Sequence, residues 1–150
     1  MIVDKLTEFG EDFDLDQETG SYLLTNQIDL GAAGVDPGAG QPVYLNVIVT
    51  ETFTDGGDAA TLVLQVRSDD SASIHASTSS LHFASGSMLK AVLTAGTKFT
   101  FALPHTNAIP YERYLGVQAV VGTAGFDSGM ISAFLSLDPT GWKPYADASN

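Results

Sequence analysis

The sequence contains no cysteine, which excludes disulfide bonds, cysteine-ligated zinc sites and cysteine nucleophiles. A cysteine-free chain suits synthesis in a reducing compartment. The sequence also lacks any apolar run near the roughly 18 residues that suggest a membrane-spanning helix. Its N-terminal stretch, MIVDKLTEFGEDF, is acidic where the apolar part of a signal peptide would lie. We therefore expect no membrane span, no secretory leader and no membrane partner.

Basic residues are scarce, because 6 lysines and arginines oppose 18 acidic residues and give a formal net charge of −12. Such a surface repels phosphate backbones, so nucleic-acid binding is not expected, whereas a basic protein surface would attract it. The acids gather at the N-terminus and predict an acidic arm over about residues 1–20. The arm is either a solvated segment or one that reaches a partner. The acids in the first 18 residues are Asp4, Glu8, Glu11, Asp12, Asp14, Asp16 and Glu18.

Helical periodicity is rare, whereas short segments with alternating apolar residues recur between glycine, proline and Asx turns. In VYLNVIVTETF (43–53) the apolar side chains share one face, and only Ile48 breaks the pattern. A strand with one apolar face buries that face. We therefore predict one all-β domain over residues 1–150, a jelly-roll-like β-sandwich of about eight antiparallel strands with a short C-terminal tail (about 139–150). The expected strands are 22–30, 43–53, 61–67, 81–84, 88–93, 98–103, 113–122 and 130–138.

Residue types that carry chemistry are present but scattered. His75, His82 and His105 form neither an HxH nor an HExxH pattern, whereas zinc or iron needs convergent imidazoles or thiolates. The many serines include no GxSxG elbow, and no base is nominated beside any of them. Asp69 and Asp70 are adjacent, so in a strand they point to opposite faces and cannot share acid–base work. We expect no catalytic residue, no metal and no cofactor, and hence a protein that is not an enzyme.

The segment FTDGGDAATLVLQVRSDD (53–70) allows two interpretations. Asp55 and Asp58 would begin a calcium site, although calcium takes about six to eight oxygen ligands. Alternatively, the segment is a β-hairpin in which Gly56 and Gly57 adopt positive φ angles to reverse the chain. The hairpin is favoured because it explains the same residues without further ligands, and the last two aspartates then close the second strand.

A series of short motifs runs along the chain from residue 2 to about residue 135. The motifs are Ile2 with Asp4–Lys5, IDLG (28–31), GQPVY (40–44), ETFTDGGDAATL (51–62), Gln65 with Asp69–Asp70, LTAGTKF (93–99), RYLGV (113–117) and GFDSG (125–129). Their order and spacing resemble those of the Bordetella-phage-type capsid cement (decoration) protein family of tailed bacteriophages. Gly116 departs from the family pattern, which tends to have a larger residue after RYL. The acid-rich segment 8–18 and the serine-rich segment 71–87 carry no motif of the family.

The resemblance implies a jelly-roll-like β-sandwich that binds the outside of an assembled capsid and has no catalytic role. Such proteins bridge neighbouring subunits of the major capsid protein. The implied partners are therefore the major capsid protein and further copies of this chain, with a dimer favoured over a trimer. The implied location is the outer capsid surface of the virion, after synthesis in the host cytoplasm.

The two ends of the chain supply the candidate contact residues. Aromatic anchors dominate interface energetics, and Trp142 is the only tryptophan, although it would equally cap one end of the sandwich. The alternative function is a jelly-roll carbohydrate-binding module in which Tyr22, Tyr44 or Trp142 stacks on sugar rings. That module would hold calcium at Asp55 and Asp58. The candidate capsid or oligomer interface residues are Ile2, Asp4, Lys5, Phe9, Phe13, Trp142 and Tyr145.

Overall fold

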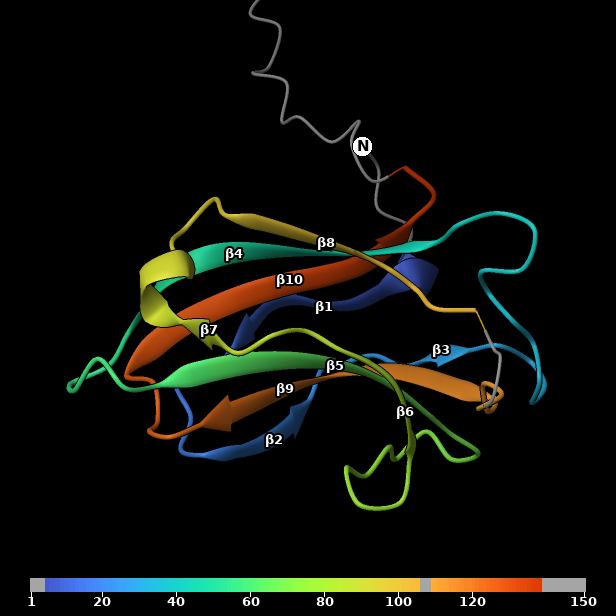
Figure 1. Cartoon of the computed structure of the whole chain (residues 1–150), viewed down its shortest axis with the longest axis horizontal. Coiled ribbons are helices and arrows are strands. Elements are labelled where there is room, and N and C mark those ends of the chain that lie inside the picture. The colour runs from blue at the N-terminus through green and yellow to red at the C-terminus, as the bar shows by residue number, and fades with distance from the viewer. Residues whose placement is uncertain (1–4, 106–108, 139–150) are drawn as a thin grey trace, which may run out of the picture.

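The computed structural model describes residues 5–105 and 109–138, which form two antiparallel β-sheets packed face to face (Figure 1). The predicted all-β sandwich is confirmed. The four-stranded sheet has the order β1 (Glu8–Asp14), β10 (Ser128–Ser136), β4 (Tyr44–Thr54) and β8 (Lys98–Ala102). The six-stranded sheet has the order β2 (Gly20–Leu23), β9 (Tyr114–Gly122), β5 (Thr61–Asp69) and β6 (Ser80–Ala84), with β3 (Ile28–Asp29) on β9 and β7 (Met88–Leu89) on β5. Two 3-10 helices are present, η1 (Lys5–Thr7) and η2 (Lys90–Val92).

The chain passes repeatedly from one sheet to the other. β4 and β5 lie in different sheets, and the same change of sheet occurs between β7 and β8 and between β9 and β10. Numbered along the chain, the eight longer strands have the orders 1-8-3-6 and 2-7-4-5. This order, in which the first strand lies beside the last, is that of a jelly roll. Segments far apart in the sequence therefore meet at each end of the sandwich.

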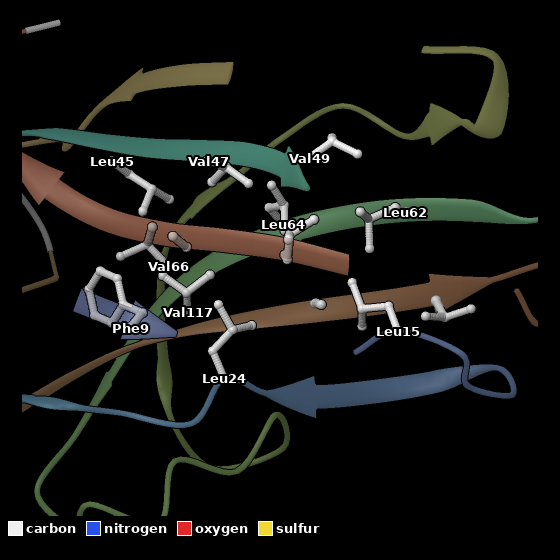
Figure 2. Close-up of a cluster of buried hydrophobic side chains, with 14 of the residues drawn as sticks. Phe9, Leu15, Leu24, Leu45, Val47, Val49, Leu62, Leu64, Val66 and Val117 are labelled. Carbon is white, nitrogen blue, oxygen red and sulfur yellow. The ribbon is translucent and has the colours of Figure 1, made fainter. Parts of the chain in front are cut away.

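The core lies between the sheets and is built from the apolar faces that the alternation predicts. Every second residue of β5 is buried, and Leu62, Leu64 and Val66 are each 0% exposed. Leu45 and Val47 of β4 face them from the opposite sheet, as Figure 2 shows. Burial of one such side chain stabilises the fold by about 1.5–3 kcal/mol. The sandwich therefore has a continuous core that holds its loops and edges in place.

The acidic N-terminal segment contains an edge strand where the sequence predicts an arm. β1 pairs with β10, and its Phe9 is fully buried in the core. The pairing has register shifts between Glu8 and Gly10 and between Gly10 and Phe13, and Asp12 has a φ of 46°. Such bulges insert extra residues into a strand and break its alternation. The sequence EFGEDFD therefore has no period-2 pattern, although it forms a strand.

The turn after β4 is not the predicted hairpin, because β4 and β5 belong to different sheets and do not pair. It is a corner that carries the chain between the sheets. The prediction of positive φ at Gly56 and Gly57 is also wrong, since the left-handed residue of the turn is Asp58, with a φ of 56°. Aspartate is several-fold enriched in this conformation. Asp69 is the last residue of β5, and its Oδ1 accepts a hydrogen bond from the backbone two residues later.

The loop of residues 70–79, which contains the first part of the serine-rich segment, folds back over the outer face of the six-stranded sheet. Its Ile74 is buried there, and Gln118 of β9 donates a hydrogen bond from Nε2 to the Ile74 carbonyl at 2.8 Å. Gly116 leaves the space for this side chain, because a Cβ at residue 116 would lie 2.6 Å from Ile74 Cδ1. The departure from the family pattern at Gly116 therefore has a local steric reason.

Candidate functional site

The structure describes three of the seven candidate interface residues. Lys5 lies in η1 and is exposed. Phe9 is 0% exposed in the core, so its ring has no surface to offer a partner. Phe13 is half-buried and packs against the core. The candidates that lie outside the described residues are Ile2, Asp4, Trp142 and Tyr145.

Negative charge is concentrated along β1 and the turn that follows it. Within the described ranges β1 pairs only with β10, so its other edge carries no strand. No lysine or arginine occurs between residues 8 and 18. Charges and bulges on an edge strand discourage unspecific strand pairing, and a field of one sign attracts an oppositely charged protein surface. The acidic edge is defined by Glu8, Glu11, Asp12, Asp14, Asp16 and Glu18.

Large apolar side chains are exposed at both ends of the sandwich, among other places on its surface. At one end, Leu6 is 78% and Leu137 is 58% exposed, and the pairing of β1 with β10 brings these residues to the same end. At the opposite end, Leu89 is 52% and Val92 is 49% exposed, beside the corner between β4 and β5 (Figure 1). Because contiguous exposed apolar surface is the usual mark of a protein-interaction site, both ends are candidate contact surfaces. We call these the Leu6–Leu137 end and the Leu89–Val92 end.

Asp55 and Asp58 bind a lysine where the sequence allows a calcium ion. Lys90 Nζ lies 2.8 Å from Asp55 Oδ1 and forms a second ion pair with Asp58. The Asp55 carboxylate also accepts hydrogen bonds from the backbone N–H groups of Asp58, Ala59 and Ala60, at 3.2, 2.8 and 2.7 Å. The ammonium group of Lys90 thus takes the position that a calcium ion would need. Hydrogen bonding to Lys90 and then to the Ala60 N–H holds the pKa of Asp55 below its usual value.

This geometry predicts a pH-dependent contribution of Asp55 to stability. Since the folded state lowers its pKa, the contribution is present above the unfolded value of about 3.9 and is lost as the pH falls through the folded pKa. We expect Asp55→Asn to lower the melting temperature at pH 7, and the difference from the unmodified protein to shrink below about pH 4. Thermal melts between pH 7 and pH 2.5 measure this, with the exposed Asp70→Asn as a control that stays close to the unmodified protein. A constant difference at every pH would contradict this role of the charge.

One histidine forms a polar contact that the sequence does not reveal. Ser68 Oγ lies 2.7 Å from His82 Nε2 and accepts a hydrogen bond from the Glu112 N–H at 2.9 Å. The ring of His82 stacks on Tyr111 with 4.0 Å between centroids. Burial lowers the pKa of His82, and the charge of Glu112 opposes that shift. Ser68 is 0% exposed, so its hydroxyl is out of reach of a substrate in this structure. The contact joins β5, β6 and the segment before β9.

The other two histidines lie apart from each other. His75 is exposed in the loop of residues 70–79, and His105 Nδ1 lies 3.8 Å from Asp36 Oδ2. In the part of the chain that the structure describes, no three histidine or carboxylate side chains are placed to hold a metal ion.

The two tyrosines proposed for sugar stacking lie on different sheets. Tyr22 is on β2, and its hydroxyl donates a hydrogen bond to the Glu18 carbonyl at 2.9 Å. Tyr44 is on β4 and pairs with Ala102 of β8. These two side chains therefore do not form one stacking platform, and Trp142 lies outside the described residues.

Comparison with known proteins assigns the chain to a family. A family model named Bbp16 matches residues 17–135, which is well over half of the chain and spans β2 to most of β10. The family name is phage-associated and is consistent with a Bordetella phage protein. Curated proteins gave no match. None of the helices in the described ranges is long and apolar enough to cross a membrane. On the extent of the match, the chain belongs to the Bbp16 family.

Proposed function

We propose that this protein is a non-enzymatic virion structural protein, a capsid cement (decoration) protein that binds the outer surface of an assembled phage capsid. It would bridge neighbouring subunits of the major capsid protein. A bridge needs two separate contact surfaces, and the placement of exposed apolar side chains at the Leu6–Leu137 and Leu89–Val92 ends meets that need. This observation carries the proposal.

The acidic edge supports the same function. A basic shell surface would attract it over several ångströms and orient the protein before the apolar ends make contact. With a net charge of −12, the chain would also be repelled by the packaged nucleic acid, which discourages unspecific binding to it. Charge therefore favours a protein partner at the capsid surface.

The effect on the shell follows from mass action. A protein that binds the closed shell more tightly than its separated subunits stabilises the shell, and the stabilisation grows with the logarithm of its concentration once that exceeds Kd. Many copies over one shell, or a dimer that engages two joints together, multiply a modest affinity per contact. We therefore expect a homo-oligomer, with a dimer favoured over a trimer.

The test uses shells of the major capsid protein encoded in the same phage genome. We expect the purified protein to co-sediment with expanded shells and to raise the temperature at which they break apart. Binding should weaken between 50 and 200 mM salt, since screening reduces the contribution of the acidic edge. An absence of binding, together with an unchanged disruption temperature, would overturn the proposal.

A further inference from the structure

The outer face of the four-stranded sheet carries two adjoining hollows. One, of about 90 Å³, lies over β4 and β8, and the other, of about 210 Å³, lies over β1, β10 and β4. Ile48 and Phe134 line both hollows. Ile48 is the residue that breaks the alternation of its strand, so its apolar side chain lies on the outer face. We call the two hollows together the cross-sheet groove, which runs over all four strands.

A buried polar group in the cross-sheet groove lacks one hydrogen bond. Asn46 is 7% exposed and lines the smaller hollow. Its Oδ1 accepts a hydrogen bond from Thr100 Oγ1 at 2.9 Å, whereas its Nδ2 has no partner in the described part of the chain. Rotating the amide by 180° exchanges the two atoms and leaves the oxygen unpaired instead. Because a buried unpaired polar atom costs about 1–3 kcal/mol, a ligand that supplies an amide group would recover that cost.

The two ends of the cross-sheet groove carry opposite charge. Glu8 and Glu11 of β1 line the larger hollow, and Lys98 of β8 lines the smaller one. Three strand spacings of about 4.8 Å make the sheet roughly 14 Å across, which is the length of four or five extended residues. Since a dry cavity of about 150 Å³ accepts a benzene molecule, the hollows have the size of single side chains.

We propose that the cross-sheet groove binds a short extended peptide of the major capsid protein, an inference that rests on the cement function proposed above. A backbone peptide group offers both a donor and an acceptor, so it pairs with Asn46 in either orientation of its amide. An apolar side chain of the peptide fills a hollow beside Ile48, and a basic residue lies beside Glu8 and Glu11. A second copy of this chain is a poorer occupant, because it has only 6 basic residues against 18 acidic ones.

The first test compares the binding of two groove variants to shells. We expect Ile48→Lys to weaken binding at least tenfold, because it places a charge in the apolar part of the groove. The matched control is Val63→Lys, a half-buried valine on the outer face of the opposite sheet, which should bind within about twofold of the unmodified protein. Asn46→Ala should weaken binding severalfold while the melting temperature stays equal or rises, because it removes the unpaired amide. This second variant keeps the test valid if Ile48→Lys fails to fold.

The second test identifies the occupant. Thr50 is exposed and lines the larger hollow, so Thr50→p-benzoylphenylalanine places a photo-crosslinker there. Crosslinking to a major capsid peptide that contains a basic residue supports the inference, whereas crosslinking to a second copy or to residues 139–150 overturns it. If the unmodified protein and both groove variants bind shells with the same affinity, the inference about the groove is overturned and the cement function is not. If the unmodified protein does not bind shells, both the inference about the groove and the cement function are overturned.

Discussion

Replacing Phe9 with alanine is expected to lower the free energy of unfolding by about 3–5 kcal/mol, the usual cost of deleting a buried phenyl ring. For a chain of this size the melting temperature would fall by about 6–20 °C. The reason is that Phe9, although it sits in an acidic segment near the N-terminus, is 0% exposed and belongs to the core. Thermal or urea unfolding of Phe9→Ala measures the loss.

The control for Phe9→Ala is Leu6→Ala, three residues away and 78% exposed. We expect this variant to unfold within about 0.5 kcal/mol of the unmodified protein. Its effect should instead fall on shell binding, because Leu6 belongs to the Leu6–Leu137 end. If Phe9→Ala were as stable as the unmodified protein and lost only binding, the N-terminal segment would be an arm and the assignment of β1 would be contradicted.

Gly129→Ala is expected to destabilise the fold by about 2–6 kcal/mol. Gly129 has a φ of 144°, a backbone conformation that L-residues rarely adopt, and such strain costs about 1–3 kcal/mol. A Cβ at this position would also lie 2.5 Å from Cγ and Cδ1 of Phe53, and such overpacking costs about 1–3 kcal/mol more. The Phe53 ring cannot easily move, because it is 2% exposed and meets Phe126 edge to face at 4.8 Å.

Gly57→Ala is the matched control for this substitution. A Cβ at residue 57 would meet no atom within 4 Å, and the residue lies in the exposed corner between β4 and β5. Its free energy of unfolding should stay within about 0.5 kcal/mol of the unmodified value. Equal melting temperatures for Gly57→Ala and Gly129→Ala would show that the contact between Gly129 and Phe53 does not constrain the core.

The strands that bury one complete face could be located from the sequence. The predicted strand 61–67 is β5 (Thr61–Asp69), and 113–122 is β9 (Tyr114–Gly122). The predicted strands differ from those of the structure where the backbone leaves the regular pleat. Segment 22–30 divides into β2 and β3, and segment 88–93 forms the short β7 and then η2. Apolar periodicity alone cannot show such a break, because the buried side chains on either side still fit a strand.

The pairing of the strands could not be read from the turns. Sequences such as TDGGD and GFDSG mark reversals, and a reversal usually joins neighbouring strands of one sheet. In this jelly roll both motifs are corners between sheets, because each sheet must bury its own apolar face against the other. β1 escaped prediction for a related reason, since bulges around Asp12 remove the alternation that identifies other strands.

The candidate contact surfaces are properties of the fold more than of any motif. The acidic edge could be anticipated from composition, although its placement on an edge strand could not. Leu6 and Leu137 lie at the same end of the sandwich only because β1 pairs with β10, whose contacting residues Asp12 and Ser132 are 120 positions apart in the sequence. The cross-sheet groove had one signal in the sequence, Ile48, which breaks the apolar alternation of its strand. Its meaning depended on knowing which side of β4 faces outward.

The bridging claim is tested most directly by a cryo-electron-microscopy reconstruction of expanded shells saturated with the purified protein. We predict density for the sandwich on the outer surface, above the joints between major capsid subunits. The Leu6–Leu137 end and the Leu89–Val92 end of each bound assembly should contact different subunits. Density that touches one subunit only, or that lies on the inner surface of the shell, would contradict the function proposed for this protein.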